Sequence, residues 1–331
     1  MNKRNKIFLG MALAAAMLPM AACTDDVPQT IRLEVSTETA GAKMTLGSDR
    51  YTYFEEGDIV KINNQPYALA SDGSGGYHWA DVQFPQDGNC YTAFFPASLQ
   101  AQDLADFTGD VDLAYGYVSR IMRMKLPRVY NYNPATGKID IPMVALAKLN
   151  STRLRFKHMC AVIGLTIDNQ ATGQVGNIGR VRIDSVMFSI NGGTQDLLSG
   201  EYSIRILDDG GIIGSMSAQS SAPNAASGFK RVSVDLPDNY YMENQLTIPV
   251  PIPPVANGKT LTVTLYGWNH LTTSTSSSMR QFTYSADFTL TRAITRNQYV
   301  SATATLNGEG MNFFMFIDNS IEPHNNNGNL W

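Results

Sequence analysis

Apolar and polar residues alternate along much of this chain with a period of two. The pattern is clearest over residues 30–36, 260–265, 283–290 and 300–306. Successive side chains of a β-strand point to opposite faces, so each segment is predicted to be a strand with one buried and one solvated face. Turn residues such as Gly, Asn and Pro separate the segments. Short strands at this spacing predict an all-β chain built from antiparallel β-sandwiches.

A change of pattern near residue 148 predicts a domain boundary. Residues 159–167 are apolar on both faces, as expected for a strand that is central in its domain. We therefore expect an N-terminal β-sandwich over residues 30–147 and a C-terminal β-sandwich over residues 148–307. Residues 308–331 would then form a C-terminal extension.

Three segments depart from the simple strand pattern. Residues 97–107 carry a weak signal for one short helix, and residues 142–149 for a turn or two of another. Residues 246–255 contain four prolines. Because proline removes a donor from the β-ladder, this run predicts an edge strand or an extended connector.

Composition supports an exported all-β protein rather than a nucleic-acid binder. The 331 residues are 44% hydrophobic and only 16% charged, and the net charge is -4. Removing the basic residues Lys3, Arg4 and Lys6 with the leader leaves 22 basic against 29 acidic residues, a net charge of -7. An acidic surface argues against nucleic acid or anionic lipid as the main partner.

The N-terminus has the layout of a secretory signal peptide. Residues 1–22 place a basic head before an apolar stretch and small residues, and the stretch is shorter than the roughly 20 residues needed to span a bilayer. Cys23 follows directly, which resembles a bacterial lipoprotein box. The resemblance implies cleavage before Cys23, a diacylglycerol and palmitate lipid on this residue, and residues 23–29 as a lipidated linker. A plain secreted protein is the alternative.

Two other cysteines, Cys90 and Cys160, lie in apolar, strand-like segments. An oxidising exported compartment permits a disulfide between them, and two separately buried thiols are the alternative.

Four segments, in order along the chain, carry a family resemblance. They are the opening pattern at 41–60, the strand Tyr-Thr-Ala-Phe-Phe-Pro-Ala at 91–97, the strand Leu-Arg-Phe-Lys-His-Met-Cys-Ala at 154–161, and the proline run at 249–254. With them the chain resembles the fimbrillins, the subunits of type V pili of Bacteroidia. The resemblance implies two tandem transthyretin-like antiparallel β-sandwich domains in a structural subunit of cell-surface fimbriae that supports adhesion.

The resemblance also implies how subunits join. An Arg-specific protease removes the N-terminal strand of a lipid-anchored outer-membrane precursor, and a C-terminal strand from a neighbour fills the groove. The implied partners are other fimbrillin subunits in a head-to-tail polymer, the outer membrane through the lipid, and a host glycan or protein receptor. Such a contact restores backbone hydrogen bonds at two strand edges.

This chain offers residues for both steps. Arg50 is the best placed cleavage site, since Arg32 lies inside a strand; a solvated turn residue is the alternative reading of Arg50. The candidate donor strand is 311–317. Its apolar face consists of Met311, Phe313, Met315 and Ile317. A final strand of the chain's own sheet is the alternative, and a shaft, tip or anchor role stays open.

The sequence contains no recognisable catalytic or metal-binding set. Its four histidines are scattered, and His158 fits a structural position within a strand. The acidic residues at 55–58 are predicted to form a turn. The chain is therefore interpreted as non-enzymatic and without a metal. The alternative function is a lipid-anchored monomer that binds glycans, for which Trp79 and Trp268 would be stacking residues, although core packing explains them more simply.

Overall fold

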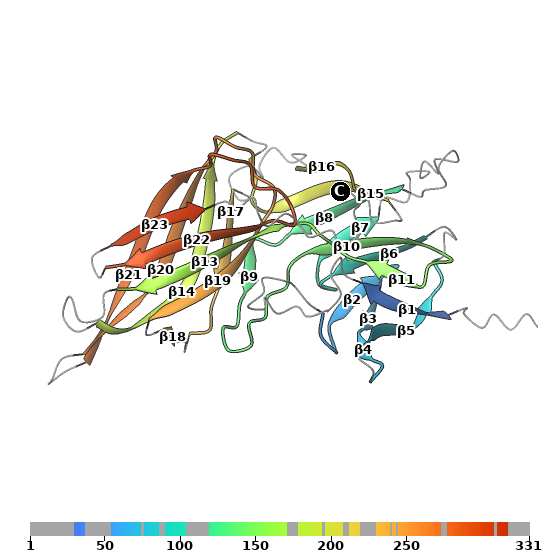
Figure 1. Ribbon diagram of the computed structural model, residues 1–331, viewed down its shortest axis with the longest axis horizontal. Coiled ribbons are helices and arrows are strands. Elements are labelled where there is room, and N and C mark those ends of the chain that lie inside the picture. Colours follow the sequence, from blue (N-terminus) through green and yellow to red (C-terminus); the bar gives the residue numbers. More distant parts are fainter. Residues whose placement is uncertain are drawn as a thin grey trace, which may run out of the picture.

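Figure 1 shows the computed structural model of the chain as an assembly of β-strands. The structure describes residues 30–36, 54–73, 76–85, 90–103, 119–170, 178–193, 196–207, 212–218, 230–238, 240–242, 244–272, 277–307 and 310–316. All regular elements in these ranges are strands. The described residues therefore contain no helix long and apolar enough to cross a membrane. The all-β, sandwich-type prediction is confirmed.

The prediction of two short helices is wrong over the described residues, which end at 103 in the first segment. β7 lies within residues 97–107, and β10 lies within residues 142–149. Every residue from 143 to 147 is buried, so β10 is a strand covered on both faces. A short apolar run of this kind has no period that separates a buried strand from a helical turn.

Two sheets built mainly from the N-terminal half pack face to face. Phe54 and Phe156 lie between them, with ring centroids 5.1 Å apart, and contact Trp79 on one sheet; Phe54 also contacts Phe95 on the other. The first sheet has the order β11 (Arg153–Arg155), β1 (Thr30–Ser36), β5 (Tyr77–Gln83), β4 (Ala70–Ser71). The second has the order β12 (Lys157–His158), β10 (Met143–Lys148), β6 (Cys90–Phe95), β2 (Ile59–Ile62), β3 (Gln65–Ala68).

Two further sheets face each other in the C-terminal half. Phe313 of one contacts Phe188 and Phe288 of the other. The third sheet has the order β19 (Gln245–Ile252), β13 (Ala161–Asn169), β22 (Tyr299–Leu306), β23 (Met311–Phe316). The fourth has the order β21 (Ser277–Thr289), β20 (Thr260–Thr272), β14 (Ile178–Asn191), β17 (Arg231–Asp235), β9 (Val129–Asn131), with β18 (Tyr241–Met242) also on β14.

A fifth sheet joins the two halves of the chain. β15 from the C-terminal half pairs with β8 from the N-terminal half. In turn, β9 from the N-terminal half pairs with β17 of the fourth sheet. In Figure 1, β15 and β16 accordingly lie beside β7 and β8. The order of the fifth sheet is β16 (Ile212–Ala218), β15 (Gly200–Leu207), β8 (Ser119–Leu126), β7 (Gln100–Asp103).

The sheets therefore do not separate at residue 148. β11 and β12 follow that position and pair with β1 and β10. The division into two tandem domains at 148 stays a prediction, and any boundary has to accommodate these crossings. Parallel pairing is a second difference from the expected antiparallel pattern. It joins β1 to β11, β13 to β22, and β17 to β9, all pairs of strands that are distant in the sequence.

Two other predictions about strands are confirmed. β13 lies between β19 and β22, and seven of its nine residues are buried, as expected for a central strand. The proline-rich β19 lies at the edge of the same sheet. An edge position tolerates proline because one side of the strand needs no ladder donors.

Candidate functional site

The first strand, β1, is hydrogen-bonded along both of its edges. It pairs in parallel with β11, where Glu34 is opposite Arg153, and antiparallel with β5, where Leu33 is opposite Trp79. The register shifts between Ile31 and Leu33, which marks a β-bulge. A strand with two partners leaves two unpaired edges if it is removed.

The side chains of β1 divide between core and solvent as the sequence pattern predicts. Leu33 is fully buried and Ile31 packs against the core, whereas Arg32 is exposed. On the solvated side, the Arg153 Nε donates to Glu34 Oε2 at 3.0 Å, and Arg32 lies 3.8 Å from the Asp72 carboxylate. These ion pairs are on the solvated face and contribute little to the stability of the fold. Apolar burial and backbone pairing therefore hold β1.

The last described strand, β23, occupies an edge. Its residues pair antiparallel with β22, from Leu306 opposite Met311 to Ser301 opposite Phe316. In the described part of the chain, β22 is its only strand partner, so β23 presents one edge without a strand neighbour. The segment 311–316 is thus an edge strand of the chain's own sheet, which is the second of the two readings of its sequence.

The alternation predicted for this segment is present over the described residues. Met315 is 9% exposed, and Met311 and Phe313 pack against the core. The ring centroid of Phe313 lies 6.4 Å from that of Phe188 and 6.2 Å from that of Phe288. Phe314 points the other way and is 70% exposed. One face of β23 therefore packs against the apolar core, and Phe314 lies on the solvated face.

Several predicted site residues lie outside the described ranges. These are the signal peptide at 1–22, Cys23 with the linker to residue 29, Arg50 and Ile317. Lipidation at Cys23, cleavage at Arg50 and the donor role of the Met311, Phe313, Met315 and Ile317 face remain predictions.

Cys90 and Cys160 are both buried, and no disulfide joins these two described cysteines. Burial raises the pKa of the Cys160 thiol to about 12, and a hydrogen bond with the Tyr130 side chain opposes this shift. Burial raises the pKa of Tyr202, with Cys160 adding to the shift. The Cys160 site thus brings together β9, β15 and the segment that enters β13, and it is a packing site rather than a reactive one.

The aromatic residues considered for glycan stacking have structural roles. Trp79 is fully buried in the aromatic cluster. Trp268 is half-buried; its Nε1 donates to Asp184 Oδ2 at 2.9 Å, and the Arg182 guanidinium lies 5.4 Å from its ring centroid. The acidic residues at 55–58 form the predicted turn, in which the Glu55 amide donates to Asp58 Oδ2 at 2.7 Å.

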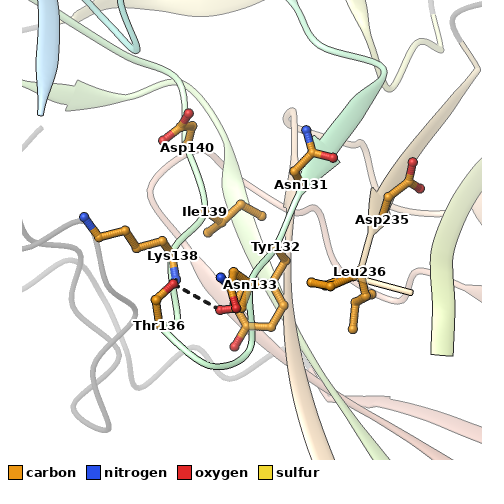
Figure 2. Close-up of a pocket in the computed structure, with 10 residues that line it drawn as sticks. Asn131, Tyr132, Asn133, Thr136, Lys138, Ile139, Asp140, Asp235 and Leu236 are labelled. Atoms are coloured by element: carbon orange, nitrogen blue, oxygen red, sulfur yellow. Dashed lines mark hydrogen bonds between the residues drawn. The ribbon is translucent and has the colours of Figure 1, made fainter. Parts of the chain in front are cut away.

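Sequence reasoning missed a surface pocket. It has a volume of about 550 Å³ and lies between the segment 131–140 and the end of β17 (Figure 2). The run Asn-Pro-Ala-Thr-Gly at 133–137 is typical of a turn. No local pattern indicates that the fold brings this turn beside Asp235, about 100 residues later. The lining residues are Asn131, Tyr132, Asn133, Thr136, Lys138, Ile139, Asp140, Asp235, Leu236 and Pro237.

Comparison with known proteins finds distant structural neighbours only. No protein-family model and no curated protein matches the chain. A candidate cell adhesion protein of Bacteroides uniformis is 15% identical, with a TM-score of 0.42, over 87% of this chain and 97% of that one. Another candidate cell adhesion protein, from Bacteroides ovatus, is 10% identical, with a TM-score of 0.41, over 87% of this chain and 96% of that one.

A third neighbour is the tip fimbrial protein Mfa3 of Porphyromonas gingivalis with a C-terminal truncation. It is 8% identical, with a TM-score of 0.33, over 86% of this chain and 99% of that one. These neighbours are described as adhesion and fimbrial proteins, not as enzymes. At such identities and TM-scores, the function of this chain has to be inferred from its own residues.

Proposed function

We propose that this chain is a structural subunit of cell-surface fimbriae that is exported as a lipoprotein precursor and joins its neighbours by strand exchange. The observation that carries the proposal is the contrast between the two terminal strands. β1 is held between two neighbours and buries Leu33, whereas β23 is an edge strand with a ready apolar face. Loss of the first strand creates a slot of the kind that a strand like the last can fill.

The direction of assembly follows from this asymmetry. The donor strand and the acceptor slot are different surfaces, so each contact is head-to-tail and repeats into a filament instead of closing into a dimer. Donation also removes β23 from β22 of its own chain. The free-energy gain therefore depends on β23 burying more apolar surface, and pairing along two edges, in the neighbour.

The export steps complete the proposal. Cys23 would hold the precursor in the outer membrane through its lipid, and cleavage after Arg50 would release the segment that contains both the lipid and β1. A subunit that keeps its lipid would serve as an anchor, and a cleaved subunit would serve in the shaft. Both follow from the sequence resemblance and the position of β1.

Limited digestion with an Arg-specific protease tests the proposal. Digestion of the full chain is expected to give Tyr51 as the new N-terminus and a ladder of high-mass species on unboiled gels. Arg50→Lys keeps the charge and should give no ladder; the matched variant Arg32→Lys should behave like the original chain. Cleavage at Arg50 that leaves only monomers over a wide range of concentrations would overturn strand exchange.

A further inference from the structure

β21 is the longest of the described strands that lie at the edge of a sheet. It pairs with β20 along all 13 of its residues, and no register shift interrupts the ladder. In the part of the chain that the structure describes, β20 is its only strand partner, so the other edge of β21 carries backbone donors and acceptors without a strand neighbour. Figure 1 shows β21 on the side of the C-terminal half that lies away from the N-terminal strands.

The other edge strands in the described ranges are either protected against pairing with another chain or already assigned to assembly. β3, β4, β7, β9, β11, β12 and β18 have only two to four residues each. The register of β16 against β15 is interrupted, and β19 contains Pro249 and Pro251. Short length, irregular register and proline all keep edge strands from joining one another. Since β23 is the proposed donor, β21 remains as the open edge.

β21 lacks these protective features. Its sequence contains no proline and no lysine, and its two charged residues are Arg280 and Asp287. On its solvated face, Thr283, Ser285 and Asp287 are exposed. The Thr262 hydroxyl of β20 donates to Asp287 Oδ1 at 2.6 Å, which ties this carboxylate to the neighbouring strand. β21 is therefore held firmly on its own sheet while its outer edge stays regular.

The side chains of β21 are self-complementary in an antiparallel pair. With Tyr284 at the centre, Gln281 of one copy lies opposite Asp287 of the other, and Phe282 lies opposite Ala286. An amide opposite a carboxylate, and a large ring opposite a methyl group, are both favourable cross-strand pairs. In a parallel pair in register, Asp287 would lie opposite Asp287 and the like charges would repel each other. The sequence of the strand therefore favours an antiparallel pair of identical edges.

We propose that β21 is an interface at which two copies of this chain pair edge to edge, antiparallel about Tyr284. The pairing continues the fourth sheet from one copy into the other and satisfies backbone groups along both edges. Each copy contributes the same surface, so the contact closes into a two-fold dimer. Between filaments, such contacts would join neighbours side by side; this consequence rests on the proposed function, whereas the pairing itself does not.

Edge pairing and strand exchange differ in what they bury, so they can be measured separately. Edge pairing joins backbone groups beside a polar face, whereas strand exchange inserts apolar side chains into a core. We therefore expect a weak, reversible dimer that forms without protease and dissociates on unboiled gels. Sedimentation velocity of the undigested chain over a wide range of concentrations measures it, in a mild detergent that prevents association through the apolar N-terminal segment. A chain that is monomeric at every concentration overturns the edge pairing and leaves strand exchange untouched.

Added charge at the centre of the edge tests the location of the interface. Thr283→Lys/Ser285→Lys places lysines opposite each other in two symmetric pairs and should raise the dissociation constant of the dimer about tenfold. Gln245→Lys/Thr247→Lys is the matched control, since it adds the same charge at exposed positions of β19 and should leave the dimer unchanged. Mixing the first variant with Thr283→Glu/Ser285→Glu should restore dimers, which also shows that both variants are folded. An unchanged dimer in the first variant, or no recovery in the mixture, overturns the assignment to β21.

Disulfide cross-linking tests the direction of the pairing. Gln281→Cys/Asp287→Cys places cysteines at directly opposed positions of the two copies, where Cα atoms about 4.5–5.5 Å apart suit a disulfide. The two positions lie about 20 Å apart along one extended strand, so they cannot join within a chain. We expect covalent dimers from the double variant under oxidising conditions and none from either single variant. Covalent dimers from Asp287→Cys alone would show a parallel pair in register and overturn the two-fold arrangement.

Discussion

Leu33 and Trp79 lie opposite each other on β1 and β5, and both are completely buried. The Trp79 ring in turn contacts Phe54 and Phe156, with centroids 6.3 and 5.8 Å apart. The first strand thus covers an aromatic cluster that the remaining strands of its sheet leave open. This relationship makes β1 a stabilising element of its sheet, and under the proposed assembly its loss would open a groove over the aromatic cluster.

We predict that Leu33→Ala destabilises the full chain by about 2–5 kcal/mol, because it leaves a cavity beside Trp79. Arg32→Ala, one position away on the exposed side, should change the free energy of unfolding by less than about 0.5 kcal/mol. Urea denaturation followed by tryptophan fluorescence measures both. Equal effects of the two substitutions would show that β1 does not cover the core.

A disulfide that fixes β23 on its own sheet should block assembly. Thr303 and Phe314 are directly opposite each other on β22 and β23. Opposite residues of antiparallel strands have Cα atoms about 4.5–5.5 Å apart, which suits a disulfide. The double variant Thr303→Cys/Phe314→Cys is therefore expected to stay monomeric after protease treatment without reductant. Adding reductant should restore the ladder, and each single variant should assemble under both conditions. A ladder that forms while the disulfide is intact would rule out 311–316 as the donor.

The pairing of strands across the two halves of the chain predicts one cooperative unfolding unit. β15 supplies the buried residues Tyr202, Ile204 and Ile206 to a sheet that also contains β7 and β8 from the N-terminal half. Ile204→Ala should lower the stability of the whole chain by about 2–5 kcal/mol and keep a single calorimetric transition. Glu201→Ala, on the exposed side of β15, is the control. Two separate transitions in the original chain would indicate independent halves.

The sequence pattern predicts the local alternation of buried and exposed residues in the strands, but little of the long-range pairing between strands. Alternation identified Leu33 as buried and Phe314 as lying on the face opposite Phe313, because strand periodicity is a property of neighbouring residues. The pairing of β9 with β17 and of β8 with β15 joins segments about 100 and 80 residues apart, and no local pattern specifies such partners. The pocket went unpredicted for the same reason, since Asn131 and Asp235 meet only through that pairing.

His158, at the junction between β12 and β13, is predicted to make the stability of the chain depend on pH in the acidic range. Burial lowers its pKa to about 4, with Arg296 and Lys157 adding to the shift. The unfolded chain has the ordinary value near 6.5, so between these values the unfolded state binds more protons than the folded state. Stability is therefore unaffected by this group above about pH 6.5 and falls as the pH drops toward 4.

The expected loss from His158 alone is about 3 kcal/mol at pH 4. His158→Gln removes the titrating group, so its stability should fall less steeply between pH 6.5 and 4 than that of the original chain. Urea denaturation at half-unit intervals of pH measures the difference between the two curves. The Arg296 guanidinium, which donates to the His158 carbonyl oxygen at 3.4 Å, stays in place in this variant. Parallel curves across the whole interval would mean that His158 is protonated equally in the folded and unfolded states.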